Sequence, residues 1–309
     1  MRPEHRGVLM LEGLDGGNPL AFLAALGTLR AAAHAWPETM PRLSWRLHQG
    51  AWRPRMTDVP AERPDQFVQI LSLWLAQGKE NPSFHFSDNL VLSTEAFRDQ
   101  AIKAQRCAAP DNRTFADFLA AFACEATTTK DSGKKVVVQD TALRTMSGAG
   151  HQHFIRFMQK LAEETSSEQI YSALFEPWQY RDGPPSMRWD PNDDRRYALR
   201  WANPSGDKIK TVRGANRLAI EALPLLPAMP VRRTLETTGF TGKNWTWPIW
   251  ECPAKLEVVR SLLALPELQE LQKRPTARTE LCRRGIVEIY RSRRLTTGKY
   301  RNFTQGVPV

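Results

Sequence analysis

The feature that most constrains the fold is a strand–turn–helix pattern near the N-terminus, EGLDGGNPLAFLAALGTLR, residues 12–30. The apolar residues 8–14 predict a short buried strand, and the glycines that follow allow a sharp turn. Asn18 is a good N-cap, and Pro19 suits the first helical position because its missing N–H costs nothing there. We therefore predict a packed helix over residues 19–35, ending before a Trp-Pro pair.

A glycine-rich turn before a helix can also hold a phosphate. This turn lacks the lysine of a P-loop, and its glycines do not have the spacing of a dinucleotide-binding fingerprint. Asp15 would also repel an anion. The loop is thus interpreted as a structural turn, with backbone approach to a nucleic-acid strand as a minor alternative.

The remaining patterns predict a mixed chain. Alternation around His48-Gln49-Gly50 predicts a hairpin over residues 42–56. Helices are predicted at 64–77, 94–106, 114–126, 151–164, 214–223 and 256–265. Strands are predicted at 136–139, 195–201, 207–213, 231–240, 244–251 and 285–295, the last turning back into 299–303. The expected fold class is α+β, with helices and antiparallel strands mixed. A Pro- and Gly-rich passage at 175–194 predicts two lobes, an N-terminal α+β lobe (1–175) and a C-terminal basic, β-rich lobe (176–309).

Positive charge is concentrated in the C-terminal half. The net charge is +10; residues 273–301 contribute +8 (ten Lys/Arg, two Glu) and residues 195–217 contribute +6 (seven Lys/Arg, one Asp), which leaves −4 for the remainder. Clustered basic residues are typical of nucleic-acid binders, whose phosphate contacts are independent of base sequence and sensitive to salt. With 41% hydrophobic and 25% charged residues and no long apolar run, we expect a cytoplasmic protein with no membrane segment.

Catalytic and metal-binding patterns are weak. The four cysteines form no C-x-x-C pair, and no hydrolase, zincin or kinase signature occurs. His151 and His153 are two residues apart, which on a helix directs them to different faces. Asp190, Asp193 and Asp194 could bind magnesium, although the arginines that follow and the local turn chemistry explain them without a metal. We predict no catalytic residue, no metal and no cofactor.

Three phrases carry a family resemblance: LDGGNPLAFLAALGTLRA (14–31), MRWDPNDDRRYALRWANPS (187–205) and RGANRLAIEALPLLP (213–227). Together with the closing YRSRRL and YRNFT, they resemble a subunit family of type I-G (formerly I-U) CRISPR–Cas interference systems, whose members act as or extend the large subunit and the helicase–nuclease. The resemblance touches both ends and the middle of the chain. It implies a non-enzymatic subunit of an RNA-guided surveillance (Cascade) complex in antiviral defence. Such a subunit engages target DNA and the flanking motif, and it supports recruitment of the helicase–nuclease.

The resemblance implies CRISPR RNA, target DNA, other Cascade subunits and the helicase–nuclease as partners. In such systems base pairing reads the target, while the protein contacts the flanking motif and the backbone. The residues expected at the nucleic-acid interface are Arg195, Arg196, Arg200, Lys208, Lys210, Arg213, Arg217, Arg283, Arg284, Arg291, Arg293, Arg294, Lys299 and Arg301. Two alternatives stay open. One is a metal-dependent nuclease that uses the three aspartates with His151, and the other is a protein–protein scaffold that presents Trp245, Trp247 and Trp250.

Overall fold

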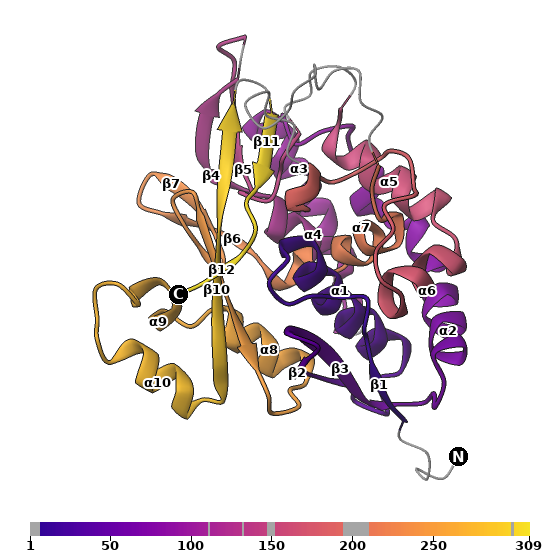
Figure 1. Cartoon of the computed structure of the whole chain (residues 1–309). Helices are drawn as coiled ribbons and strands as arrows, with labels where there is room; N and C mark the ends of the chain where they lie inside the picture. The colour runs from indigo at the N-terminus through magenta and orange to yellow at the C-terminus, as the bar shows by residue number, and fades with distance from the viewer. Residues whose placement is uncertain (1–6, 111, 132, 147–151, 194–209, 298–299) are drawn as a thin grey trace, which may run out of the picture.

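A computed structural model describes residues 7–110, 112–131, 133–146, 152–193, 210–297 and 300–309. The fold is α+β, as predicted (Figure 1). The α-helices are α1 (Pro19–Ala35), α2 (Pro64–Gln77), α3 (Thr94–Cys107), α4 (Thr114–Phe122), α5 (Phe154–Glu164), α6 (Ser167–Phe175), α7 (Arg213–Ile220), α8 (Leu256–Leu263), α9 (Glu267–Glu270) and α10 (Ala277–Arg283).

The strands are antiparallel throughout the described pairings. They are β1 (Gly7–Met10), β2 (Arg42–His48), β3 (Ala51–Val59), β4 (Ala123–Lys130), β5 (Val136–Asp140), β6 (Ala228–Val231), β7 (Thr234–Thr237), β8 (Phe240–Thr241), β9 (Asn244–Trp250), β10 (Ile286–Thr297), β11 (Tyr300–Phe303) and β12 (Val307–Pro308). One sheet has the order β1-β3-β2 and a second the order β11-β10-β9-β8, with β12 added to β10; β4-β5 and β6-β7 are separate pairs.

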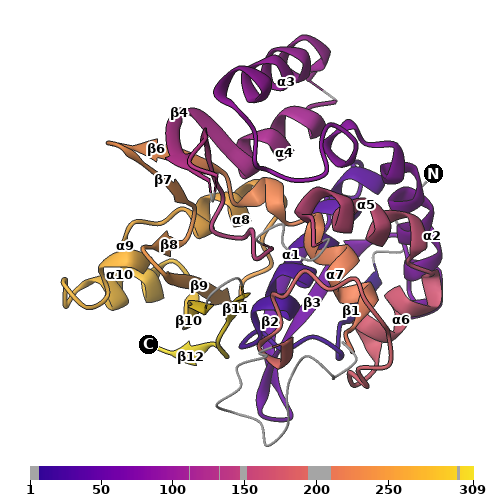
Figure 2. The same cartoon turned by 90° about the horizontal axis from the view of Figure 1, so that it is seen from above.

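Helix α1 is the centre of the fold. The Asn18 side chain accepts hydrogen bonds from the amides of Leu20 and Ala21, so the predicted N-cap is confirmed. Every residue from 19 to 32 is buried, because helices cover one side of α1 and the sheets the other (Figure 2). Gly27 is where α1 meets α7, since a Cβ there would lie 1.8 Å from the carbonyl oxygen of Leu218.

Aromatic side chains join α1 to the two larger sheets. The ring of Phe22 stacks on Trp45 of β2 at 5.6 Å and lies 5.5 Å from Trp247 of β9. Trp245 and Trp250 complete this cluster, and these three β9 tryptophans are 0–1% exposed. They are therefore core residues, and the scaffold alternative loses the surface on which it was based. Segments from both sides of the predicted lobe boundary contribute to one core, and the division into two lobes stays a prediction.

Several predicted boundaries were wrong. Strand β1 ends at Met10, because residues 11–14 form a turn in which the Leu14 amide donates to the Leu11 carbonyl. Helix α4 ends at Phe122, and residues 123–126, which were predicted as part of the helix, begin β4 instead. Helix α6 was not predicted, although its capping box between Ser166 and Gln169 was a readable signal. Of the two strands predicted at 195–201 and 207–213, residues 195–201 and 207–209 lie outside the described residues. Residues 210–213 form no strand, since Thr211 makes an isolated bridge to Asp182 and α7 begins at Arg213.

Candidate nucleic-acid interface

The β10–β11 hairpin carries four of the arginines predicted at the interface. Strand β10 pairs with β9 up to Arg293, opposite Asn244, and then continues beyond β9 to pair with β11. Ile286, Ile289 and Ser292 of β10 are buried. The hairpin therefore projects basic side chains from a strand that is anchored in the core.

The four hairpin arginines lie in different surroundings. Arg293 is exposed, whereas Arg291, Arg294 and Arg301 are half-buried. Nε of Arg291 donates to Oγ1 of Thr246 at 3.1 Å, and Nη2 of Arg294 donates to the carbonyl oxygen of Arg144 at 2.7 Å. Among the described residues, none of the four guanidinium groups forms an ion pair with a carboxylate.

Three of the four arginines in the preceding helical segment pair with glutamates instead. Arg274 pairs with Glu270 and Glu280, Arg278 with Glu288 at 3.2 Å, and Arg284 with Glu267 at 3.0 Å. Arg283 is exposed at the end of α10. The basic window at 273–301 thus divides into a paired helical part and a hairpin part without described ion pairs, a distinction that counting charges could not make. Lys299 lies outside the described residues.

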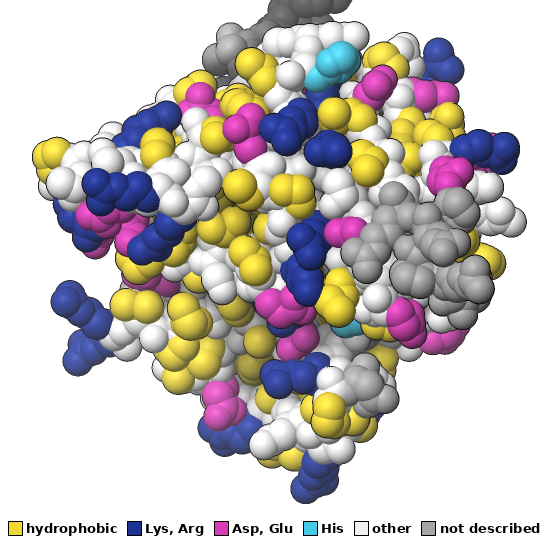
Figure 3. All heavy atoms as spheres, turned by 90° about the horizontal axis from the view of Figure 1, so that it is seen from below, with side chains coloured by type: hydrophobic (Ala, Val, Ile, Leu, Met, Phe, Trp, Pro, Cys, Tyr) yellow, Lys and Arg dark blue, Asp and Glu magenta, His cyan; other side chains and the backbone are white. Residues whose placement is uncertain are grey.

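Charges of both signs also lie mixed on the face of the molecule that Figure 3 shows. On the face seen from below, Lys and Arg side chains lie interspersed with Asp and Glu side chains and hydrophobic ones, and no single-sign area forms. The electrostatic potentials of interspersed opposite charges largely cancel, and salt screens what remains beyond a Debye length of about 8–10 Å. This face therefore offers no continuous basic surface to a polyanion.

The second basic window is only partly described. Arg195, Arg196, Arg200 and Lys208 lie outside the described residues, and Lys210 is exposed.

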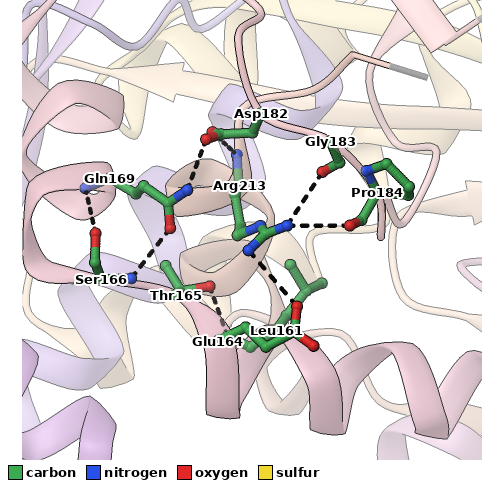
Figure 4. A network of polar contacts seen from close by, with 9 residues as sticks. All are labelled: Leu161, Glu164, Thr165, Ser166, Gln169, Asp182, Gly183, Pro184 and Arg213. Atoms are coloured by element: carbon green, nitrogen blue, oxygen red, sulfur yellow. Dashed lines mark hydrogen bonds and ion pairs between the residues drawn. The ribbon is translucent and has the colours of Figure 1, made fainter. Parts of the chain in front are cut away.

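Arg213 holds the start of α7 in place (Figure 4). Its guanidinium group donates to the carbonyl oxygen of Pro184 at 3.1 Å and lies 3.6 Å from a carboxylate oxygen of Glu164. Its backbone amide donates to Asp182 at 2.8 Å, and Asp182 also accepts from Gln169. The side chain thus joins α5 to the loop at 182–184, while the backbone amide connects through Asp182 to α6, so the main role of Arg213 is structural.

Arg217 is buried, at 1% exposure, which places it away from any nucleic-acid surface. Its guanidinium group donates to Glu221 at 2.8 Å and to the Leu75 carbonyl at 3.1 Å. Glu221 also binds Arg30, which is fully buried in α1. Arg217 therefore belongs to an internal ion network, and we leave it out of the interface.

The acidic cluster of Asp190, Asp193 and Asp194 lies only partly within the described residues. Asp190 is 2% exposed and accepts hydrogen bonds from the amide of Asn192 at 3.0 Å and from the side chain of Asn18 at 3.2 Å. Burial raises the pKa of this carboxyl group, although those hydrogen bonds and one from Tyr180 act in the opposite direction. Of Asp193 only the backbone is described, and Asp194 and His151 lie outside the described residues. Within the described part of the chain, no group of three or more His, Cys, Asp or Glu side chains could hold a metal ion.

The glycine turn at the N-terminus has its backbone groups engaged. The amides of Gly16 and Gly17 donate to the Trp52 carbonyl and to Asp15, respectively. Their carbonyl oxygens accept from the indole of Trp247 and the amide of Gly306. A phosphate at this turn would have to break these bonds, which agrees with the structural interpretation of the sequence.

In the described part of the chain, no helix is long and apolar enough to cross a membrane. No family model, curated protein or solved structure matches the chain.

Proposed function

We propose that this protein is a non-enzymatic, nucleic-acid-binding subunit of a type I CRISPR–Cas surveillance complex. The observation that carries the proposal is the β10–β11 hairpin, where Arg291, Arg293, Arg294 and Arg301 have no carboxylate ion pair among the described residues. Cations left without counter-charges on a projecting hairpin can neutralise phosphates and release the counterions of a nucleic acid.

The expected mode of binding is contact with the backbone. The hairpin presents guanidinium groups, which match phosphate oxygens in charge and geometry. Backbone contacts fix position and orientation and carry no base sequence. This suits a complex in which a CRISPR RNA reads the target by base pairing and the protein supports the flanking duplex and the opened strands.

The assignment to CRISPR interference is supported by the sequence phrases at 14–31, 187–205 and 213–227. It makes target DNA, CRISPR RNA, the other Cascade subunits and the helicase–nuclease the proposed partners. No specific observation on the described residues favours the nuclease or the scaffold alternative.

Fluorescence anisotropy with labelled duplex DNA, single-stranded DNA and RNA tests the binding. We expect the affinity of the wild-type chain to fall steeply between 50 and 200 mM salt, because each phosphate neutralised adds about 0.9 to the slope of log affinity against log salt. The double variant Arg291→Gln/Arg293→Gln should weaken binding and reduce this slope.

The matched control is Arg274→Gln/Arg278→Gln, which removes the same charge from arginines already paired with glutamates. It should change affinity less than the hairpin variant. Equal losses in the two variants would contradict the hairpin as the interface, and salt-insensitive or absent binding by the protein and its complex would contradict the function. Co-purification with a CRISPR RNA and the neighbouring subunits tests the assignment to a surveillance complex.

A further inference from the structure

Two arginines of the hairpin meet a third arginine from a distant part of the sequence. Arg144 follows β5, Arg294 lies on β10 and Arg301 lies on β11, opposite Thr296. The contact between the side chain of Arg294 and the backbone of Arg144 joins them. Arg144 was not among the residues predicted from the sequence.

Asp140 is the one described carboxylate that acts on all three guanidinium groups. It lies 2.6 Å from Nη2 of Arg144, so three positive charges share one negative charge. The pKa of Arg294 is lowered to about 10, first by burial and then by the neighbouring Arg301 and Arg144, whose effect exceeds the opposite one of Asp140. The pKa of Arg301 is lowered as well, by burial and by Arg144. The cluster is thus an excess of positive charge that is partly removed from water.

Hydrogen-bonding capacity is also left over. Nε of Arg144 and Nε of Arg294 are buried without a partner among the described residues. Arg144 is 7% exposed and uses Nη1 on the Met146 carbonyl at 3.0 Å and, at 3.4 Å, on Asn89. An unpartnered buried donor costs stability, and a bound acceptor would offset that cost.

The segment that carries Arg144 is held rigidly. The indole of Trp189 donates to the Leu143 carbonyl at 2.9 Å, and the hydroxyl of Thr145 donates to the Met187 carbonyl at 2.6 Å. Thr141 contacts Thr237 through its hydroxyl at 3.2 Å. A charge cluster fixed by such contacts loses little conformational entropy when an anion arrives.

We propose that Arg144, Arg294 and Arg301 form a binding site for one phosphate group of a nucleic-acid backbone. The inference rests on the proposed function and deepens it, since it selects one position at which a phosphate is held by several guanidinium groups. A tetrahedral oxyanion provides the missing negative charge and several acceptor oxygens at once, which suits guanidinium donors. Exposed arginines such as Arg293 make single, solvent-screened contacts instead.

The test compares Arg301→Gln with Arg293→Gln in the full-length chain. Arg301 has no hydrogen bond or ion pair with another described residue, so its replacement by glutamine removes none of these interactions within the described part of the chain and relieves repulsion on Arg294. We expect Arg301→Gln to weaken duplex binding roughly 10- to 100-fold, the range for hydrogen bonds to charged groups. Arg293→Gln should weaken it roughly 2- to 5-fold, as for an exposed pair.

Arg233→Gln, which removes an exposed charge between β6 and β7, should leave the affinity unchanged. Arg301→Lys keeps the charge without the planar fork and should fall between wild type and Arg301→Gln. The unfolding midpoint of Arg301→Gln without ligand should equal or exceed that of wild type.

A second arm uses inorganic phosphate at constant ionic strength as a competitor. Displacement of DNA from wild type at lower phosphate concentrations than from Arg301→Gln supports the site. Equal affinity losses for Arg301→Gln and Arg293→Gln would overturn the site while leaving the proposed function intact. Phosphate binding that depends on Arg301, with DNA affinity that does not, would assign the site to a free phosphate and overturn the backbone assignment. Absence of nucleic-acid binding by wild type and its complex would overturn the proposed function itself.

Discussion

The buried network of Arg30, Arg217 and Glu221 makes the strongest stability prediction. Oε2 of Glu221 lies 2.5 Å from Nη1 of Arg30, and Oε1 lies 2.8 Å from Nη1 of Arg217, so one carboxylate serves two buried cations. Arg30 is 0% and Arg217 1% exposed. Glu221→Gln keeps the size of the side chain and removes the negative charge, which leaves both guanidinium groups uncompensated inside the protein.

Removing one partner of a buried ion pair costs about 3–5 kcal/mol, and a carboxylate shared by two arginines places this variant toward the upper end. Urea denaturation followed by tryptophan fluorescence measures the change, with the exposed Glu257→Gln on α8 as the control, expected within about 0.5 kcal/mol of wild type. Replacing all three groups, as Arg30→Met/Arg217→Met/Glu221→Leu, should recover most of the loss because no buried charge remains.

The same network sets a pH dependence. Burial alone would raise the pKa of Glu221, but Arg217 and Arg30 outweigh it and hold the pKa below its ordinary value of 4.5. The stabilisation is therefore complete above pH 4.5 and is lost as the pH falls through the lowered folded-state pKa. Glu221→Gln should lack this part of the acid-induced decrease. A loss of less than about 1 kcal/mol in Glu221→Gln at pH 7 would refute the reasoning, because it would mean that the cations are hydrated or paired elsewhere.

Three further predictions follow from single contacts. Gly27→Ala should destabilise the fold by about 1–3 kcal/mol or more in denaturant titrations, despite alanine's better helix propensity, because its Cβ would meet the Leu218 carbonyl at 1.8 Å; an unchanged midpoint would show that α1 and α7 can separate. Asp190→Asn should raise the thermal midpoint at pH 7, with the gain shrinking toward pH 4 as the wild-type carboxyl group is protonated, because burial raises its pKa; a lower midpoint at pH 7 would indicate that the charge is stabilised. Trp247→Phe should lower stability by about 1–3 kcal/mol through the lost indole bond to Gly16, without altering subunit pull-down; a selective loss of partners would revive the scaffold alternative.

Helix starts and hairpin turns could be predicted from the sequence where capping or turn residues close by in the chain determine them. The Asn18-Pro19 start of α1, the Gln49-Gly50 hairpin turn and the return of β10 into β11 all depend on capping or turn residues within a few positions. Helix α4 was predicted four residues too long because Ala123 and Cys124 pair with Asp140 and Gln139 of β5, and this tertiary pairing overrides a sequence that is compatible with a helix.

The sequence predicted that arginines form the candidate site, but it did not predict which arginines lie together or which are paired with carboxylates. The sequence places Arg217 in a basic window, although Glu221 four residues later was a readable partner for it. Its burial and its hydrogen bond to the Leu75 carbonyl of α2 come only from tertiary packing. Arg144 was missed because it lies outside both basic windows of the sequence. Folding brings it to Arg294, which is 150 residues away along the chain. Charge counts along a chain cannot distinguish these cases, because neutralisation depends on side chains brought close by folding.

This distinction changes what a basic window can mean for function. Arg274, Arg278 and Arg284 add to the net charge that attracts a polyanion over a distance, yet each already has a glutamate partner and gives up that contact to bind a phosphate. The hairpin arginines have no such described contact to give up. Long-range attraction should therefore respond to charge removed from either part of the window, whereas short-range affinity should respond to the hairpin. Association rates measured for the two double variants should accordingly fall by similar factors, with the difference between them appearing in the dissociation rate.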